Sequence, residues 1–396
     1  MKIKLAVLFG GKSVEHEISI ISAVQAMAAL NREKYDVIPV YITKDNRFFT
    51  GECLFDIESY KQNLKSLESK CDRVIFASEN DKTFIVKYPQ KKFKNNVIDY
   101  IDVALPIVHG TNVEDGTMQG FLQMYNIPYG GCDVMSSAVG MDKYVMKTVL
   151  KDNGIPVLDC KVYTSYAYEQ GTDGIIKDIE DKFDYPVIIK PINLGSSVGI
   201  KKASNREELE DALELAFEFS LKVLCERAIV NLKEINCAVL GDGEEAQASE
   251  CEEPITGDEI LSYKDKYMDN GSKGMSGLKR RMPADITNEQ RETVREMAVN
   301  AFKCLGCSGV ARIDFMMDTE TKQIFINEIN TIPGSLSFYL WEPLGIKYNE
   351  LLDRLVSLAL KRERERAALH FSFETNVLSG VTLGGAKGVK GGKLGR

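Results

Sequence analysis

Four residues near the C-terminal end of the chain have the types and the spacing for metal-dependent chemistry: Arg312, Asp314, Glu328 and Asn330. They lie in the runs GVARIDFMM and QIFINEIN, which predict two strands joined by a polar turn. Because side chains alternate along a strand, Arg312 and Asp314 share one face, and Glu328 and Asn330 share one face. If the strands pair with these faces matched, three oxygen ligands and a guanidinium meet at one patch. Such hard oxygen ligands suit Mg²⁺, although each pair alone would more often be the solvated face of a hairpin.

A second group of residues is suited to holding a phosphate. Lys190 ends the apolar run YPVIIK, and the loop Gly195-Ser196-Ser197-Val198-Gly199 follows it. Glycines let the backbone approach a phosphate, and serine hydroxyls donate to its oxygens. The loop matches neither a Walker A motif nor a dinucleotide fingerprint, so by itself it could also be a flexible surface loop.

Five further residues could complete a nucleotide site, although each alone would be an ordinary surface group. Lys143 opens a predicted helix. Glu226 and Glu234 flank a turn between two predicted strands, where they could accept from an adenine amino group and ribose hydroxyls. Lys266 and Tyr267 lie in a long loop rich in Gly, Asp, Lys and Ser, and a loop of that length usually has a function, often as a lid.

The elements that position these residues predict an α/β (α+β) chain. LAVLF, DVIPVYI and IDVALPIVH alternate with a helical stretch near the N-terminus, which predicts an open parallel α/β sheet. Ligands of such sheets lie beyond the carboxyl ends of the strands, where Gly10, Gly11, Glu15 and His109 fall. Residues 50–100 are polar and irregular, and we expect them to form a peripheral insertion.

Length and pattern divide the chain into several units, as expected for 396 residues. We predict an N-terminal α/β domain at 1–135, a central unit at 136–228, a C-terminal unit at 229–368 and a disordered Gly/Lys-rich tail at 369–396.

Bulk properties exclude several classes of protein. The net charge of −8 argues against a general nucleic-acid binder. No stretch reaches the roughly 18 apolar residues of a membrane helix, so we expect no membrane partner. Nine scattered cysteines indicate a reducing cytoplasm, and three histidines exclude a His-rich metal site.

Taken together, these motifs resemble the D-alanine–D-alanine ligase family of the ATP-grasp superfamily, which includes D-lactate- and D-serine-using relatives. The resemblance spans roughly residues 3–366. The matching segments are GGKSVEHEISIISA, HGTNVEDGTMQG, IPYGG, MDKYVMK, YPVIIKP, GSSVG, KDKY, GVARIDF and NEINTIPGS, in the order and spacing of the family.

The resemblance implies a role for each candidate residue. It implies that Glu15 binds the ammonium group of the first amino acid, with His109 nearby, and that Arg312 and Gly334 form the anion-stabilising pocket. Ser196 and Tyr267 join the catalytic group, and Ser335 and Leu336 lie at the substrate. The implied ATP-binding residues are Lys143, Lys190, Ser197, Glu226, Glu234 and Lys266. The implied ligands of two Mg²⁺ ions, with Mn²⁺ as an alternative, are Asp314, Glu328 and Asn330.

The implied activity joins two D-alanines through an acyl phosphate, for peptidoglycan precursors, in a cytoplasmic homodimer that acts on small molecules. The segment 335–341, Ser-Leu-Ser-Phe-Tyr-Leu-Trp, departs from the family's hydroxylic and histidine-containing stretch. Its apolar residues predict a larger or more apolar acceptor than D-alanine. The alternatives are therefore D-lactate, D-serine or a larger amino acid as acceptor, a nucleotide-binding relative without turnover, or a simple phosphotransferase.

Overall fold

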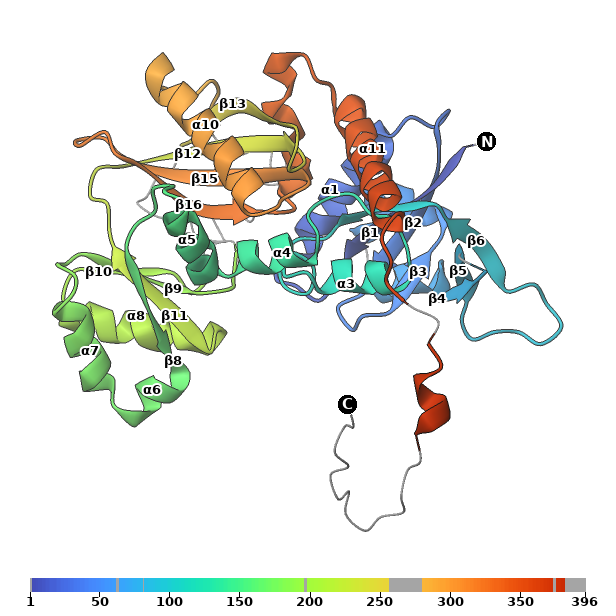
Figure 1. Cartoon of the computed structure of the whole chain (residues 1–396), viewed down its shortest axis with the longest axis horizontal. Coiled ribbons are helices and arrows are strands. Elements are labelled where there is room, and N and C mark those ends of the chain that lie inside the picture. The colour runs from blue at the N-terminus through green and yellow to red at the C-terminus, as the bar shows by residue number, and fades with distance from the viewer. Residues whose placement is uncertain are drawn as a thin grey trace, which may run out of the picture.

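The computed structural model describes residues 2–61, 64–80, 82–195, 198–255, 280–372 and 375–381, which form three β-sheets with helices packed around them (Figure 1). The expected α/β (α+β) class is confirmed.

The N-terminal sheet has seven described strands in the order β6-β5-β4-β3-β2-β1-β7. Its strands are β1 (Ile3–Gly10), β2 (Tyr35–Ile42), β3 (Phe48–Thr50), β4 (Asp72–Glu79), β5 (Lys82–Lys87), β6 (Val97–Ile101) and β7 (Val103–Ile107). β1 pairs in parallel with both β2 and β7. Strands covered on both faces are continuous apolar runs, as in LAVLF, and this parallel part was predicted. The helical elements of this unit are α1 (His16–Ala29), η1 (Glu52–Phe55), η2 (Ile57–Tyr60), α2 (Leu64–Ser69) and α3 (Thr117–Met124).

The interpretation of residues 50–100 as an irregular insertion was wrong. β3 to β6 continue the sheet in antiparallel order. β4 alternates buried and exposed side chains, with Val74 and Phe76 facing the core. The outer strands are partly exposed to solvent and carry many polar residues. The alternation of buried and exposed side chains is therefore hard to recognise in their sequence.

The central sheet is antiparallel, in the order β10-β9-β11-β8. Its strands are β8 (Cys160–Thr164), β9 (Val187–Pro191), β10 (Lys201–Ala203) and β11 (Lys222–Arg227). The helices of this part of the chain are α4 (Val134–Met141), α5 (Lys143–Asp152), α6 (Ser165–Gln170), α7 (Thr172–Glu180) and α8 (Arg206–Phe219). α8 begins where the Asn205 side chain accepts from the Glu208 amide, and its buried stripe packs on the sheet.

The C-terminal sheet is also antiparallel, in the order β14-β13-β12-β15-β16. Its strands are β12 (Leu232–Gly241), β13 (Ala246–Pro254), β14 (Arg280–Arg281), β15 (Gly309–Asp318) and β16 (Ile324–Asn330). The helical elements that follow β14 are α10 (Asn288–Cys304), η4 (Gly334–Leu340), η5 (Glu342–Leu344), α11 (Tyr348–Ala367) and η6 (Val377–Gly380). α10 lies across one face of this sheet (Figure 1). The other face is therefore left for polar side chains.

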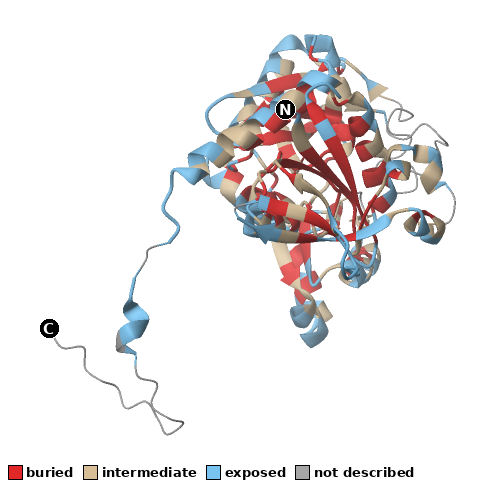
Figure 2. Cartoon of the chain, turned by 90° about the vertical axis from the view of Figure 1, so that its right-hand side faces the viewer, coloured by how far each residue is buried: buried red, intermediate tan, exposed pale blue. Residues whose placement is uncertain are grey.

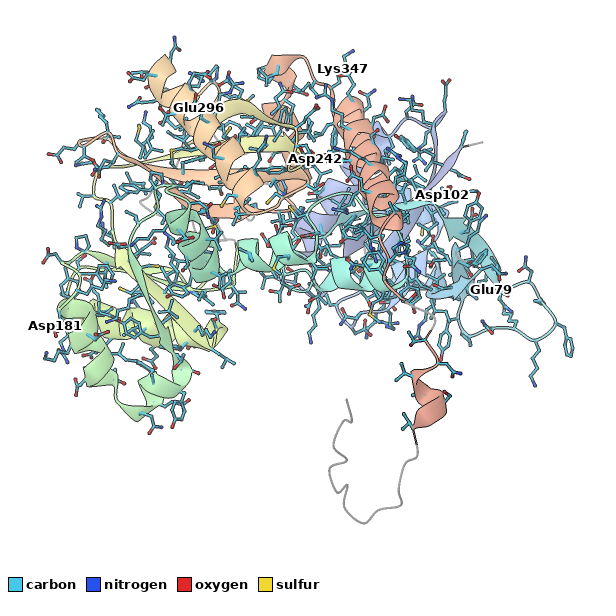
Figure 3. The ribbon with its side chains drawn as sticks, viewed as in Figure 1. Glu79, Asp102, Asp181, Asp242, Glu296 and Lys347 are labelled. Carbon is cyan, nitrogen blue, oxygen red and sulfur yellow. The ribbon has the colours of Figure 1, made fainter. Side chains whose placement is uncertain are left out.

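The C-terminal unit packs against the N-terminal sheet through α11 and η4, whose buried residues belong to the N-terminal core. Beside α11, Asp242 (labelled in Figure 3) pairs with Lys361 at 2.7 Å. Buried segments fill the middle of the molecule, and the exposed C-terminal segment extends away from it (Figure 2). Across the described residues, no helix has both the length and the apolar character to cross a bilayer.

Candidate active site

One face of the C-terminal sheet carries a row of polar residues across four strands. Glu252 on β13 lies opposite Asn236 on β12, Asn236 lies opposite Asp314 on β15, and Asp314 lies opposite Glu328 on β16. Residues directly opposite in an antiparallel pair point to the same face. The reverse face packs against α10 through an apolar cluster that includes Ile313. The row is thus fixed by strand register and held from behind by a core.

The predicted convergence of Arg312, Asp314, Glu328 and Asn330 is confirmed as geometry. Arg312 lies opposite Asn330 in the hairpin, two residues along the strands from the Asp314–Glu328 pair and therefore on the same face. The Arg312 guanidinium donates to both Asp314 oxygens, at 2.6 and 2.7 Å. Burial lowers the pKa of Arg312, but the charge of Asp314 outweighs it, and the pKa lies well above its ordinary value. Arg312 is therefore a permanent cation in this site.

The oxygen donors of the patch fit a hard divalent cation. Asp314 and Glu328 supply carboxylates side by side, and the Asn330 amide lies 3.0 Å from Asp314. Turning that amide presents its oxygen in place of its nitrogen. Within the described part of the chain there is no cluster of three or more His, Cys, Asp or Glu residues that could hold a metal. The third oxygen donor of this patch is the amide of Asn330. Two carboxylates and an amide are donors that Mg²⁺ accepts.

Lys143 reaches this patch from α5. The helix begins there because the Asp142 side chain accepts from the first free amides, which leaves the Lys143 side chain at the start of the helix. Its buried ammonium group donates to the Leu194 carbonyl at 2.7 Å and pairs with Glu328 at 3.1 Å. A buried lysine that joins the predicted phosphate loop to a metal-type carboxylate is well placed to hold phosphate oxygens.

Lys190 reaches the site from β9, where it shares a buried carboxylate with Lys147. Glu226 accepts from Lys147 at 2.7 Å and pairs with Lys190, and Lys190 also donates to Asn327 at 2.8 Å. Burial raises the pKa of Glu226, but the two lysines outweigh it and lower the pKa to about 2. Lys147 was not predicted from the sequence, although it is the last residue of the motif MDKYVMK. It lies three residues after Tyr144 and four after Lys143, and residues at these spacings share one face of a helix.

The predicted adenine and ribose roles of Glu226 and Glu234 stay predictions. Glu226 is fully buried between its lysines, and Glu234 lies on β12 two residues before Asn236, on the same face as the polar row.

The end of the N-terminal parallel sheet brings Glu15 to the phosphate loop. A Cβ at Gly110 would lie 2.9 Å from a Glu15 carboxylate oxygen, and Gly110 has a φ of +81°, so only glycine fits there. A Cβ at Gly195 would lie 3.5 Å from the same carboxylate. Glu15 is itself buried, so a cationic group bound beside it would be strongly held.

His109 is buried behind Glu15 and fixed at both ring nitrogens. Nε2 lies 2.9 Å from the Ser22 hydroxyl, and Nδ1 lies 2.7 Å from the Ile332 carbonyl, so the ring ties the N-terminal sheet to the segment before Gly334. Burial lowers the pKa of His109, which favours a neutral ring. As a neutral ring, His109 can therefore orient the Ser22 hydroxyl and the Ile332 carbonyl.

Glu114 is a half-buried carboxyl that the sequence did not single out. Its two oxygens accept from the amides of Gly110 at 2.7 Å and Ile332 at 3.1 Å. Burial, with the nearby charge of Glu15, raises its pKa to about 8. Glu114 therefore joins the two loops that border the site.

The segment 335–341, whose apolar residues predict a larger or more apolar acceptor, packs most of those residues away from the site, and the acceptor itself stays a prediction. Leu336 and Leu340 are buried in the N-terminal core, and Phe338 stacks on Tyr348 at 4.4 Å. Ser335, Leu336 and Ser337 all have left-handed φ values, between 49° and 53°, and all three side chains are buried.

Ser335 helps to hold this strained turn. Its amide donates to Ser22 at 2.9 Å, and its hydroxyl donates to Gln25 at 2.7 Å. The substrate-binding roles of Ser335 and Leu336 stay predictions, as does the role of Gly334. The predicted residues Ser196, Ser197, Lys266 and Tyr267 lie outside the described residues.

The side chain that η4 does direct to the site is Tyr339. Its hydroxyl donates to Glu252 at 2.9 Å, and the Arg280 guanidinium lies 4.0 Å from the centre of its ring. Three distant segments supply these residues, and no local pattern in the sequence identifies them.

Two family models match the chain: "D-ala D-ala ligase N-terminus" over residues 4–132 and "D-ala D-ala ligase C-terminus" over residues 149–357. The D-alanine–D-alanine ligase of Caldicellulosiruptor bescii is 42% identical over 379 residues, which cover 94% of this chain and 99% of that protein. The enzyme of the same name from Thermosipho melanesiensis is 39% identical over 376 residues, covering 95% and 98%.

Solved structures give the same result. The D-alanine-D-alanine ligase from Coxiella burnetii matches with a TM-score of 0.77 and 30% identity, covering 92% of this chain and 96% of that one. The VanG D-Ala:D-Ser ligase from Enterococcus faecalis matches with a TM-score of 0.75 and 32% identity, covering 91% and 100%.

Proposed function

This chain belongs to the D-alanine–D-alanine ligase family, and on that premise we propose that it joins two D-alanines at the expense of ATP, through an acyl phosphate, to supply peptidoglycan precursors. The fold is the ATP-grasp fold of that family. The observation that carries the proposal is the patch of Arg312, Asp314, Glu328 and Asn330. Lys143 reaches this patch through an ion pair with Glu328 at 3.1 Å.

The first step is phosphoryl transfer. The carboxylate of the first D-alanine attacks the γ-phosphorus of ATP, an acyl-phosphate bond forms, and ADP leaves. Glu15 holds the ammonium group of that substrate, and Lys143 and Lys190 hold phosphate oxygens once ATP displaces their carboxylate partners. Fixed cations lower the barrier because such a transition state spreads negative charge over the transferring oxygens.

The metal site belongs to this step. Asp314, Glu328 and Asn330 would hold two Mg²⁺ ions, with Mn²⁺ as an alternative. When bound, such ions neutralise phosphate charge and orient the γ-phosphate.

The second step forms the peptide bond. The neutral amine of the second D-alanine attacks the acyl carbon and a tetrahedral oxyanion forms. The bond between the acyl carbon and the phosphate oxygen then breaks, and inorganic phosphate leaves and takes up the proton that the amine loses. Arg312, with the amide of Gly334, stabilises that oxyanion, and Asp314 keeps the guanidinium in place through two hydrogen bonds. The resemblance alone supports catalytic roles for Ser196 and Tyr267 and phosphate-binding roles for Ser197 and Lys266.

The direct test is phosphate release from Mg-ATP with a panel of D- and L-amino acids and D-lactate, with the products identified by mass spectrometry. We expect D-alanyl-D-alanine. ATP binding without any product would support a non-catalytic relative, and a stable phosphorylated product would support a phosphotransferase. Either result would exclude ligation.

A second candidate is a ligase that takes D-serine as the acceptor. It is favoured by the match to a D-Ala:D-Ser ligase and by the polar hydroxyl that Tyr339 directs to the site from a segment rich in apolar residues. A mixed D-alanyl-D-serine product in the same panel would establish it. We further infer that the protein is a homodimer in the cytoplasm. Size-exclusion chromatography with light scattering would test the dimer.

A further inference from the structure

Helix α5 carries two buried lysines on one face, and the proposed mechanism uses only the first of them. Lys143 and Lys147 are four residues apart, so they lie one above the other on the helix. Lys143 pairs with Glu328 at 3.1 Å, whereas Lys147 pairs with Glu226 at 2.7 Å. Lys147 is 2% exposed, and a lysine is almost never buried so completely unless it is paired. The role of Lys147 is therefore to be sought at Glu226.

Glu226 has one lysine at each of its carboxylate oxygens. Oε2 accepts from Lys147, and Oε1 pairs with Lys190 from the neighbouring strand β9. Lys190 lies opposite Leu224, and Glu226 follows two residues further along β11, so Lys190 and Glu226 project from the same face of the central sheet. Two ammonium groups and one carboxylate leave a surplus of positive charge in this buried triad.

The two lysines of the triad differ in their other contacts. Lys190 also donates to Asn327 at 2.8 Å, and Asn327 is the neighbour of Glu328 in the metal patch. Lys190 therefore lies between Glu226 and the phosphate side of the site. Within the described part of the chain, Glu226 is the one hydrogen-bond and ion-pair partner of Lys147. When a phosphate of ATP takes Lys190, Lys147 stays as the counter-charge of Glu226.

Without Lys147, that exchange would leave Glu226 as an isolated buried charge. An unpaired carboxylate away from water takes up a proton, since buried carboxyls can titrate as high as about 8–9. The groups opposite Glu226 on the adjacent strands are Ile188, which is apolar, and Cys160. Burial raises the pKa of the Cys160 thiol, so this group stays neutral. Among the described residues, only Lys147 is placed to keep Glu226 ionised once Lys190 has left.

We propose that Lys147 is a positioning residue, which keeps Glu226 ionised and in place while ATP draws Lys190 to its phosphates. The inference rests on the proposed function and deepens it at the nucleotide end of the site. An ionised carboxylate can only accept hydrogen bonds, as the predicted contact of Glu226 with the adenine amino group requires. ATP then binds without the transfer of a proton to Glu226.

The test compares Lys147→Met with the matched control Lys151→Met, which removes an exposed lysine one turn further along the same helix. Lys147→Arg keeps the positive charge. Titration calorimetry with Mg-ATP at about pH 8, in two buffers of different ionisation enthalpy, gives the number of protons taken up on binding. The KM for ATP and kcat are measured from about pH 6 to about pH 8, and hydroxylamine captures the acyl phosphate.

We expect Lys147→Met to take up about one proton more than wild type when it binds ATP. Its KM for ATP, relative to wild type, should rise by about tenfold per pH unit, because binding that takes up one proton weakens by that factor. The change in kcat should be smaller, since Lys143, Lys190 and the metal ligands are untouched. Lys151→Met should match wild type, and Lys147→Arg should restore the wild-type proton balance.

A double variant keeps the inference testable if Lys147→Met alone folds poorly. In the Glu226→Gln background no carboxylate needs a counter-charge. Adding Lys147→Met there should leave the KM for ATP within about twofold of Glu226→Gln alone. A further large rise in KM would show that Lys147 acts independently of Glu226 and would overturn the inference.

Equal proton uptake by Lys147→Met and Lys151→Met would also overturn the inference, while leaving the proposed function intact. A wild-type enzyme that forms no hydroxamate from ATP and any amino acid would instead overturn the proposed function, and the role of Lys147 with it.

Discussion

Replacing Glu226 with Gln should destabilise the central unit, because it removes the only negative charge of a buried ion triad while keeping the size of the side chain. Lys147 lies 2.7 Å from one oxygen of Glu226, and Lys190 pairs with the other. The carboxyl is 1% exposed. Lowering its pKa from 4.5 to about 2 corresponds to about 3 kcal/mol at 1.36 kcal/mol per pH unit. Breaking buried pairs by removing one partner costs about 3–5 kcal/mol. We therefore expect a loss of about 3 kcal/mol at pH 7.

The pH dependence of this loss has a definite sign. A carboxyl whose pKa is depressed in the folded state stabilises the protein above its unfolded pKa of about 4.5, and this stabilisation is lost as the pH falls toward 2. The wild-type free energy of unfolding should therefore fall through that window, whereas Glu226→Gln should lack this component. The two proteins should differ by about 3 kcal/mol at pH 7 and converge near pH 2.

Native-state hydrogen exchange at the amides of β9 and β11 is the appropriate assay, because a chain with several sheets need not unfold in one step. The matched control is Asp159→Asn, which removes an ion pair with Lys151 whose side chains are 68% and 67% exposed. Exposed pairs contribute about 1 kcal/mol or less, so this variant should lie close to wild type. Equal protection of β9 and β11 in wild type and Glu226→Gln at pH 7 would refute the reasoning.

Four further results should follow. Asp314→Asn should reduce phosphate release by more than about 100-fold across a Mg²⁺ titration, because it removes a metal ligand and the partner of Arg312 together; retained turnover at high Mg²⁺ would contradict the assigned site. Chelation of divalent cations should abolish turnover, and Mg²⁺ or Mn²⁺ should restore it. Glu114 has a pKa raised to about 8, so it stabilises the folded protein below pH 4.5, and this stabilisation is lost as the pH rises through 8. The thermal midpoint of Glu114→Gln should therefore decline less between about pH 6 and 9 than that of wild type. Leu336→Ala should cost about 2–5 kcal/mol by opening a core cavity and leave acceptor preference unchanged, as a substrate panel would show.

The metal patch could be predicted from the sequence because it depends on local rules. Alternation along two strands and a short turn between them are sufficient to bring Arg312, Asp314, Glu328 and Asn330 to one face, and the observed register pairs them directly. Lys143 and Lys190 follow the same logic, since each ends or begins a regular element that the pattern identifies.

The acceptor side could not be predicted in this way. Glu252, Arg280 and Tyr339 come from a strand, a two-residue strand and a 3₁₀ turn that are far apart in the sequence. The placement of the apolar side chains of segment 335–341 could not be predicted either, because composition does not reveal that three consecutive residues have left-handed φ values. Tertiary contacts to Ser22 and Gln25 hold that conformation, and they come from the other end of the chain.

The register of the sheet also indicates where acceptor preference can change without loss of the first step. The row runs from Glu328 through Asp314 and Asn236 to Glu252, so the phosphate residues and the cluster around Glu252 occupy opposite ends of one rigid surface. Substitutions on β15 or β16 disturb Arg312 and the metal ligands, and would weaken both half-reactions. Substitutions of Glu252 on β13 or of its partners Arg280 and Tyr339 act at the far end of the row. Because strand spacing fixes the distance between the two ends, a larger acceptor can be accommodated only by side-chain changes at that far end. Altered acceptor specificity in this chain should therefore map to Glu252, Arg280 and Tyr339, with the phosphate residues unchanged.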